Sequence, residues 1–160
     1  MSHPISIILS TYNRQTLLPR MLDSLLSQTF SDFELLLINN GSTDQTQYVQ
    51  RDSRIRYFSL EKNQGAARAR NFGLDHALGD YVSMVDDDDY CCPDMMQTLF
   101  DMAAEHQADI AVVGCQNAYG DELEDFYVYD EEFVLRGSGG LSAFLERKLY
   151  NTNAGTKLFR

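Results

Sequence analysis

The sequence predicts an α/β fold, in which a mostly parallel, Rossmann-like sheet lies between helices in a three-layer α/β/α arrangement. The first observation is a series of short apolar runs, at residues 5–9, 33–38, 55–58, 81–85 and 110–115. The second is that segments with leucine, alanine or methionine at helical spacing separate these runs. Strands that alternate with helices pair in parallel, because each helical connection crosses from one end of the sheet to the other.

Each intervening segment carries a signal for the start or the end of a helix. The expected helices cover residues 16–28, 42–54 and 66–78, and a further helix has Pro93 at its first position. Pro19 fits in the first turn of its helix, where a missing N–H costs little. Residues 42–45 have the spacing of a capping box, and Gly79 is a typical stop after the third helix.

The pattern weakens from about residue 118. Residues 119–133 are acidic and rich in tyrosine, and they predict either an irregular hairpin or a surface loop. A short helix is expected over residues 141–149, after the glycine-rich residues 137–140.

Composition narrows the class of protein. A chain of 160 residues with 44% apolar residues is most simply one globular domain with its own core. The formal net charge of −11 disfavours nucleic acid and anionic membrane surfaces as partners. We expect no transmembrane segment, because no apolar run approaches the roughly 20 residues of a membrane span. We also expect no signal peptide before the first predicted strand. Three cysteines, an odd number without zinc-ligand spacing, indicate a reduced, cytoplasmic chain.

Four consecutive carboxylates, at residues 86–89, follow the predicted strand 81–85 directly. Adjacent carboxylates repel one another unless a cation or hydrogen-bond donors neutralise them. A solvated acidic turn is one interpretation, but the position at the end of a buried strand favours a cation site. Mg²⁺ or Mn²⁺ commonly joins one or two carboxylates to substrate phosphates. An EF-hand loop is excluded, because its sixth position needs glycine and is Cys91 here.

Polar segments are expected to meet at one edge of the sheet, because ligands of open parallel sheets bind beyond the carboxyl ends of the strands. Three such segments follow predicted strands, at residues 10–14, 39–44 and 86–89. Gly65 opens the next helix on the same side, with Arg68 and Arg70 in its first turns. Carboxylates for a metal, amides for a neutral ring and arginines for anionic oxygens together suit a metal-bound nucleoside diphosphate.

Five segments resemble, in order and spacing, the family 2 glycosyltransferases of the GT-A fold: residues 5–14, 27–35, 40–44, 63–71 and 79–89. Pro93 and Asp94 also resemble that family's helix start after the acidic motif. The match is specific from residue 5 to about residue 105 and looser afterwards, although residues 155–160 resemble a lysine-leucine-aromatic-arginine segment before the acceptor region.

The resemblance implies a metal-dependent glycosyltransferase that moves a sugar from a nucleotide donor, usually a UDP-sugar, to an acceptor hydroxyl with inversion. Cell-surface polysaccharide or glycan synthesis fits this activity, with a glycan, lipid-linked or protein acceptor. A cytoplasmic location is implied, or a peripheral one at the inner face of the membrane where the acceptor is lipid-linked. Residues 1–117 would form the donor-binding core, and residues 118–160 would begin a truncated acceptor-side region.

The resemblance also assigns roles to individual residues. Asp88 would coordinate Mn²⁺ or Mg²⁺, and Arg70 would reach the diphosphate, with Arg68 as the alternative. The residues implied to contact the nucleotide are Ser10, Thr11, Tyr12, Asn40, Arg70, Asp86 and Asp87. The general base of the family lies further along the chain, beyond Arg160.

Two departures from the family, the absent general base and an altered residue pair, keep a function without catalysis open. Most relatives carry an aspartate pair where this chain has Asn39 and Asn40, so recognition of the base is altered. A nucleotide-sugar-binding module without catalysis is one alternative. A nucleotidyltransferase is another, but it would need a glycine-rich phosphate loop after the first strand, and residues 10–14 contain no glycine.

Overall fold

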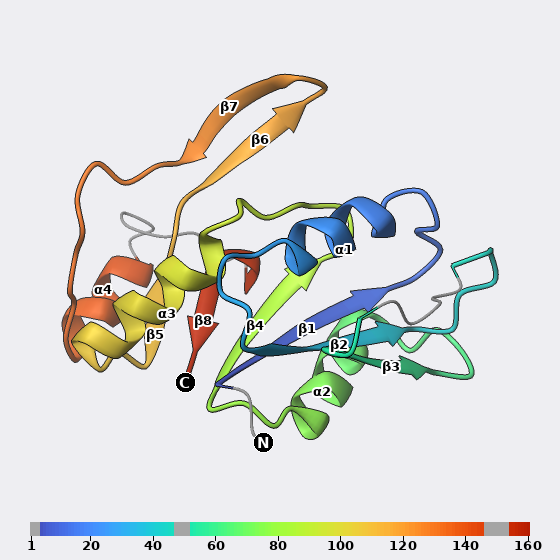
Figure 1. The fold of residues 1–160 in the computed structure, drawn as a ribbon. Helices are drawn as coiled ribbons and strands as arrows, with labels where there is room; N and C mark the ends of the chain where they lie inside the picture. The colour runs from blue at the N-terminus through green and yellow to red at the C-terminus, as the bar shows by residue number, and fades with distance from the viewer. Residues whose placement is uncertain (1–3, 47–51, 146–153) are drawn as a thin grey trace.

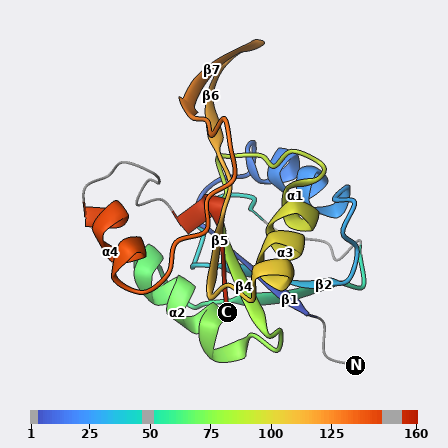
Figure 2. The same ribbon diagram turned by 90° about the vertical axis from the view of Figure 1, so that its left-hand side faces the viewer.

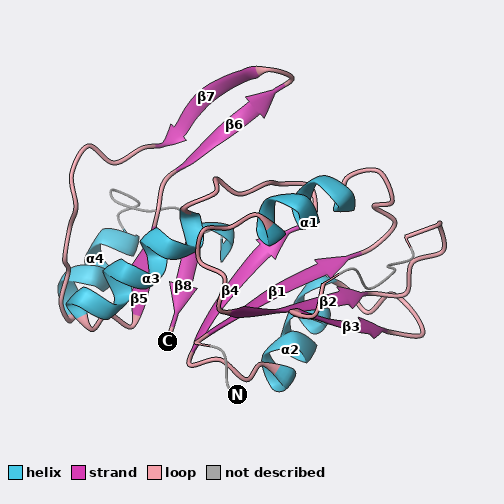
Figure 3. Cartoon of the chain, viewed as in Figure 1, coloured by secondary structure: helices cyan, strands magenta, loops and turns pink. Residues whose placement is uncertain are grey.

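The computed structural model describes residues 4–46, 52–145 and 154–160. Strands and helices alternate through most of the first two thirds of the chain, except that β3 (Ile55–Ser59) is the next described element after β2 (Phe33–Asn39) (Figure 1, Figure 3). Their bounds are β1 Ile5–Thr11, α1 Leu18–Leu26, β2 Phe33–Asn39, β3 Ile55–Ser59, α2 Ala66–His76, β4 Tyr81–Asp86, α3 Met95–His106, β5 Ile110–Val112, β6 Cys115–Tyr119, β7 Glu122–Tyr127, α4 Ser138–Leu145 and β8 Lys157–Phe159.

The central sheet has the strand order β3-β2-β1-β4-β8-β5. β1 pairs in parallel with both β2 and β4, and β3 continues the parallel half beyond β2. β8 lies between β4 and β5 and is antiparallel to both. The chain therefore leaves β1 toward one side of the sheet and later returns to its other side, which creates a topological switch point between β1 and β4. The predicted α/β class with a mostly parallel sheet is confirmed.

Helices cover both faces of the sheet, because alternate residues of its strands point to opposite sides. α1 and α3 pack on the face that carries Ile7 and Leu9, and α2 packs on the face that carries Ile8 and Ile38 (Figure 2). α2 approaches closely at Gly73, where an added Cβ would lie 2.6 Å from Cγ2 of Ile8. β1 and β2 are almost fully buried, as expected for central parallel strands.

A buried carboxylate holds the amino-terminal end of the sheet together. Glu34 on β2 is 2% exposed and accepts hydrogen bonds at 2.6 Å from Ser6 Oγ, from Leu78 N and from Arg56 Nη1. Burial alone raises the pKa of Glu34, but the hydrogen bonds from Ser6, Arg56 and Leu78 outweigh burial and leave the pKa below its ordinary value.

Several element boundaries differ from the sequence expectations. Residues 42–46 form bends and not the predicted start of a helix, while residues 47–51 of that prediction lie outside the described residues. Pro93 lies before the first residue of α3, whose N-cap is Asp94. The predicted strand 110–115 ends at Val112, which pairs with Lys157 at the start of β8, and Cys115 already belongs to β6 and pairs with β7. Between them, Gly114 lies so close to the Tyr127 carbonyl that no Cβ would fit.

The later part of the chain forms a hairpin and a helix. β6 and β7 make a separate two-stranded antiparallel sheet that projects from the body of the molecule, which agrees with the hairpin alternative (Figure 1). α4 begins inside the glycine-rich segment, and residues 146–149 of the predicted helix lie outside the described residues. The sheet includes β8, so both sides of position 117 contribute strands to it; the division at residue 117 stays a prediction. Within the described ranges, no helix is long and apolar enough to cross a bilayer.

Candidate functional site

The acidic run begins at the last residue of β4, beside the end of β1. Asp86 is in register with Ser10 of β1 and is half-buried. Asp87 is buried, whereas the side chain of Asp88 is 52% exposed. The four carboxylates therefore follow the switch point between β1 and β4, at the carboxyl edge where ligands of open α/β sheets bind.

Three arginines from three different segments neutralise this run. Arg70 of α2 forms an ion pair with Asp86. Arg14, in the loop after β1, lies 3.5 Å from Asp87 (Nε to Oδ1) and 3.6 Å from Asp88 (Nη2 to Oδ2). Arg20 of α1 donates from Nη2 to the Asp88 carbonyl oxygen at 2.6 Å. These contacts explain how adjacent carboxylates coexist at the edge of the sheet.

The fourth carboxylate has a different environment. Burial raises the pKa of Asp89, and the negative charges of Asp88 and Asp86 raise it further, while Arg20 opposes them. The Arg20 guanidinium lies 4.9 Å from the centroid of the exposed Tyr90 ring, a cation–π arrangement beside the run. The raised pKa of Asp89 favours the protonated form of its carboxyl group.

The loop after β1 is fastened to the loop after β2. Asn13 has a positive φ of 54°, and its Oδ1 accepts from Thr43 N at 2.8 Å. Asn13 N donates to Ser42 Oγ at 3.0 Å, and Arg14 N donates to Thr46 Oγ1 at 3.1 Å. Ser42 Oγ is one group that the predicted capping box would have needed, and the other, the Gln45 N–H, donates to Gln15 Oε1 at 3.1 Å. Both are used between the loops, and residues 42–46 do not start a helix.

Asp44 holds the same loop from inside. Its Oδ1 accepts from Thr46 N at 2.8 Å and its Oδ2 accepts from Gln15 N at 3.4 Å. The hydrogen bond with the side chain of Thr46 is the main reason that the pKa of Asp44 is lowered, and the bond with the Thr46 N–H lowers it further. This carboxylate therefore serves the loop and does not belong to the acidic run.

Asn40 joins the loop after β2 to the start of α2. It is 4% exposed; its Oδ1 accepts from Gln64 N at 3.0 Å and its Nδ2 donates to Asn63 Oδ1 at 3.2 Å. Gly41 has a positive φ of 72°, and an added Cβ would overlap with the backbone of Lys62. One N–H and one lone pair of the Asn40 amide are left for a ligand.

Two orphaned polar atoms lie at this edge. Among the described residues, the buried side-chain nitrogen and oxygen atoms without a hydrogen-bond partner are Thr11 Oγ1 and Arg70 Nε. Thr11 is the last residue of β1 and is 2% exposed. Tyr12 follows it with 38% of its surface exposed, which leaves the ring accessible. Buried groups of this kind usually have partners, so their position here indicates a place for a polar ligand.

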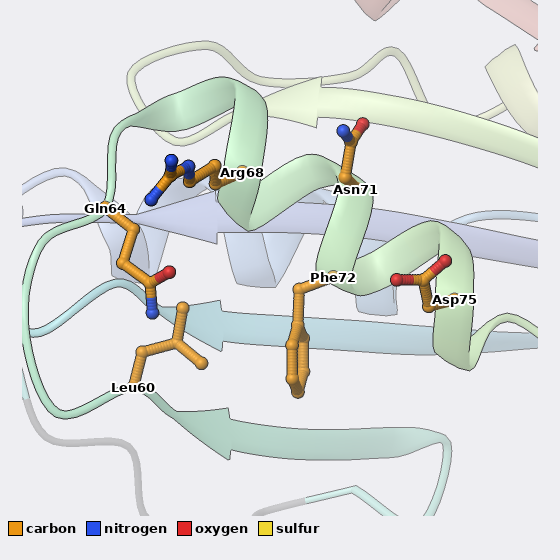
Figure 4. A pocket seen from close by; sticks show the side chains of 6 residues that line it. All are labelled: Leu60, Gln64, Arg68, Asn71, Phe72 and Asp75. Atoms are coloured by element: carbon orange, nitrogen blue, oxygen red, sulfur yellow. The ribbon is translucent and has the colours of Figure 1, made fainter.

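The structure distinguishes between the two arginines of α2. Arg70 faces the acidic run, whereas Arg68 lines a separate cavity of about 350 Å³ beside β3 (Figure 4). The other residues that line this cavity are Leu60, Gln64, Asn71, Phe72 and Asp75. A larger cavity of about 1460 Å³, lined by residues of α3, β5 and the segment 127–137, includes none of the four aspartates.

The donor atoms fit a divalent cation shared with a substrate. No group of three or more His, Cys, Asp or Glu side chains within the described ranges is arranged to hold a metal alone. Asp88 nevertheless presents hard carboxylate oxygens to solvent, and Mg²⁺ usually takes one or two carboxylates together with substrate phosphates and water. The residues thus fit a metal completed by a diphosphate.

Arg14 and Arg20 received no role from sequence reasoning. Arg14 belongs to the polar segment 10–14, and its place on the same edge as residues 86–89 was the available signal. Arg20 gave no signal, because its contact is to a main-chain carbonyl and depends on how α1 packs over the loop.

Comparisons with known proteins agree with this geometry. The model of the family "Glycosyl transferase family 2" matches residues 6–158. Glycosyltransferase GlyG of Streptococcus pneumoniae is 34% identical over 134 residues, which cover 81% of this chain and 44% of that protein. The chain therefore spans less than half the length of this relative.

The solved structures of S. aureus TarS are also similar. TarS 1–349 has a TM-score of 0.73 at 25% identity and covers 98% of this chain and 46% of its own. TarS 1–349 in complex with UDP-GlcNAc has a TM-score of 0.68 at 29% identity, over 74% of this chain and 36% of that one. With a family match over nearly its whole length and the sheet order described above, the chain belongs to glycosyl transferase family 2 and has the GT-A fold.

Proposed function

We propose that the protein is the donor-binding part of a glycosyltransferase that transfers a sugar from a UDP-sugar to an acceptor hydroxyl with inversion. The observation that carries the proposal is the arrangement at the carboxyl edge of the sheet. Asp86 to Asp88 meet Arg70 and the end of β1 there, with Thr11 Oγ1 and Arg70 Nε buried and unpartnered. The UDP-GlcNAc complex of the similar TarS structure supports a UDP-sugar as the donor class.

The proposal gives each side chain of the edge a task in binding. The accessible ring of Tyr12 stacks on the base, and the remaining N–H and lone pair of Asn40 contact the edge of the base. Ser10, Thr11 and Asp86 contact the ribose and neighbouring polar atoms. Arg70 reaches the diphosphate, for which a planar fork of donors is suited. Asp87, which is buried beside Arg14, contacts the nucleotide from the loop after β4.

Asp88 would hold Mn²⁺ or Mg²⁺ together with the diphosphate. When bound, the cation offsets the charge that develops on the leaving nucleoside diphosphate. Asp88 would hold the cation just after the end of β4. Arg14 and Arg70 keep the neighbouring carboxylates of Asp87 and Asp86 in place. We assign no residue of the chain as general base, and we propose that residues 118–160 begin the acceptor side.

The wider role follows from the same proposal. The acceptor would be a hydroxyl of a glycan, a lipid-linked saccharide or a protein, in the synthesis of a cell-surface polysaccharide or glycan. A lipid-linked acceptor would bring the protein to the inner face of the membrane.

Calorimetric titration of UDP into the chain tests the donor site directly. We expect UDP to bind in the presence of Mn²⁺ and to lose most of its affinity when EDTA removes the metal. GDP and CDP serve as controls and should bind more weakly. Absence of binding by every nucleotide would overturn the proposal for this chain.

A binding module without catalysis is the second candidate. It is favoured by Asn39 and Asn40, which stand where the resemblance to the family implies aspartates and are both used in contacts within this chain. The longest native protein distinguishes the two candidates: a module binds UDP-sugar without hydrolysing or transferring it, whereas an enzyme releases UDP when an acceptor is present.

A further inference from the structure

Arg14 combines a fixed backbone with a loosely held side chain. Its N–H donates to Thr46 Oγ1 at 3.1 Å, and its carbonyl oxygen accepts from Leu17 N at 3.1 Å and Leu18 N at 2.9 Å. The side chain is 45% exposed. The root of the side chain thus stays in place while its guanidinium is free to change partners.

The guanidinium bridges two carboxylates without a close hydrogen bond to either. Its distances of 3.5 Å to Asp87 and 3.6 Å to Asp88 exceed the usual N–H···O range. Arg20, in contrast, donates to the same loop at 2.6 Å. Half-exposed ion pairs of this length are weak and easily replaced.

The partner of Arg14 is also the carboxylate that we propose as metal ligand. A guanidinium and a divalent cation on Asp88 would repel each other at close range. The donor that accompanies the cation brings a diphosphate, to which arginine binds with paired N–H groups. Binding of the cation with the donor would therefore both repel the Arg14 guanidinium from the carboxylates and offer it the diphosphate as a new partner.

We propose that Arg14 is a place-holding counter-ion, which neutralises Asp87 and Asp88 in the free protein and turns to the donor's diphosphate when a divalent cation takes Asp88. This inference rests on the proposed function. Its consequence is that metal and nucleotide bind with positive coupling. The diphosphate draws Arg14 away from the cation, and the cation releases Arg14 from the carboxylates so that it can bind the diphosphate. Such coupling is reciprocal, so either ligand reports it.

Mn²⁺ binding, followed by the electron paramagnetic resonance signal of the free ion, tests the proposal with and without saturating UDP. We compare the unchanged chain with Arg14→Gln, Arg14→Lys and Arg136→Gln. Arg136 is exposed and lies outside the site, so its variant removes the same charge without touching the acidic run.

Arg14→Gln should bind Mn²⁺ alone roughly threefold to tenfold more tightly than the unchanged chain, because the competing cation is gone. For the coupling, we compare the ratio of the Mn²⁺ dissociation constant without UDP to that with UDP. In Arg14→Gln this ratio should be at least about threefold smaller than in the unchanged chain, a change within the range of typical coupling factors. Arg14→Lys keeps the charge but not the fork, so its affinity for Mn²⁺ alone should stay near the original and its coupling should fall. Arg136→Gln should change neither quantity more than about twofold, since the charge is distant and screened.

Two results would overturn the counter-ion role: Arg14→Gln binding Mn²⁺ alone no better than Arg136→Gln does, or an unchanged coupling ratio. Failure of the proposed function has a separate signature. If UDP binds to no variant with or without Mn²⁺, the donor site is wrong, while the comparison of Mn²⁺ alone still decides whether Arg14 competes for the loop.

Discussion

Asp88 and Asp94 are both exposed carboxylates between β4 and α3, yet we expect only Asp88 to serve the nucleotide. Asp88→Ala should abolish Mn²⁺-dependent binding of UDP. Asp94 is the N-cap of α3 but makes no capping hydrogen bond through its side chain. Asp94→Ala should therefore leave binding intact and cost only about 0.3–1 kcal/mol of stability through the helix dipole. Calorimetry and urea unfolding measure the two effects, and equal losses of binding would remove the role of Asp88.

Glu34 gives the fold a pH dependence at its buried end. Because hydrogen bonds from Ser6, Arg56 and Leu78 outweigh burial and hold the pKa of Glu34 below its ordinary value, the folded state favours the ionised carboxylate. Its contribution is complete above the unfolded pKa of about 4.3 and is lost as the pH falls through the lower folded pKa.

Glu34→Gln isolates this contribution. We expect the variant to lose about 1.5–3 kcal/mol at pH 7, the usual value of a hydrogen bond to a charged group, because Arg56 loses its ionic partner. The difference from the unchanged chain should shrink below about pH 4.3, as the carboxylate of the unchanged chain is protonated. Urea unfolding at several pH values measures it, with the exposed Glu61→Gln as control. A difference that stays constant down to pH 3 would contradict the assignment.

At the scale of elements, two glycines with positive φ provide a matched comparison. Gly41 has a φ of 72° and its Cβ position overlaps with the Lys62 backbone, whereas Gly120 has a φ of 64° at the hairpin turn with open space around it. Gly120→Ala should cost about 1 kcal/mol for backbone strain alone. Gly41→Ala should cost at least about 1 kcal/mol more, because overlap with a backbone forces the loops apart.

The two loops joined at Gly41 also carry Asn40 and the start of α2. Gly41→Ala should consequently weaken UDP binding, and Gly120→Ala should not. Urea unfolding and UDP titration of both variants provide the measurements. Equal stability losses would show that the contact between the loops carries no strain.

The sequence predicted the elements whose signal is local. The strands at residues 5–9 and 33–38 and the helix of Pro19 were found because burial imposes a pattern on consecutive residues. The helix start at residues 42–45 was wrong, because the two groups that a capping box would join, Ser42 Oγ and the Gln45 N–H, bond instead to Asn13 and Gln15 of another loop. β8, with three residues, was missed because its pairing with β4 and β5 is set by distant parts of the chain.

The candidate site was predictable to a similar degree. Residues 86–89 stood out, because four carboxylates after an apolar strand are rare enough to need a cause. The sequence kept Arg68 and Arg70 as alternatives. Side chains two positions apart point about 200° away from each other around a helix, so only the packing of α2 decides which arginine meets Asp86. The role of Asn40 as a link to Asn63 depends on the approach of two loops, for which spacing carries no signal.

At the scale of the whole molecule, the sheet depends on residues near both ends of the described chain. β8 lies between β4 and β5, and β5 is the edge strand that has β8 as its neighbour. Leu158 is fully buried, and Ser83 Oγ of β4 donates to the Lys157 carbonyl at 3.0 Å. The hairpin of β6 and β7, in contrast, pairs with itself and projects outward (Figure 1).

These contacts predict that one deletion lowers the free energy of unfolding strongly and that another hardly changes it. A chain shortened to residues 1–117 loses β8, so β5 has no strand to join it to β4, and the face under α3 loses Leu158. We expect its free energy of unfolding to fall by about 3 kcal/mol or more, since burial of one leucine alone contributes about 1.5–3 kcal/mol. Replacing residues 117–124 by two glycines should change stability by less than about 1 kcal/mol, because these residues are exposed or half-buried and their strands pair only with each other. It should also leave UDP binding unchanged.

Urea unfolding of both shortened chains decides where the core of the fold ends. If the chain of residues 1–117 keeps the original free energy of unfolding, the predicted division at residue 117 holds and β8 contributes little. If it unfolds readily while the hairpin variant stays stable and binds UDP, the donor core includes β8, and residues 115–127 are an insertion between two parts of one sheet. We expect the second result, because a strand paired on both sides contributes backbone hydrogen bonds and a buried side chain that solvent cannot replace.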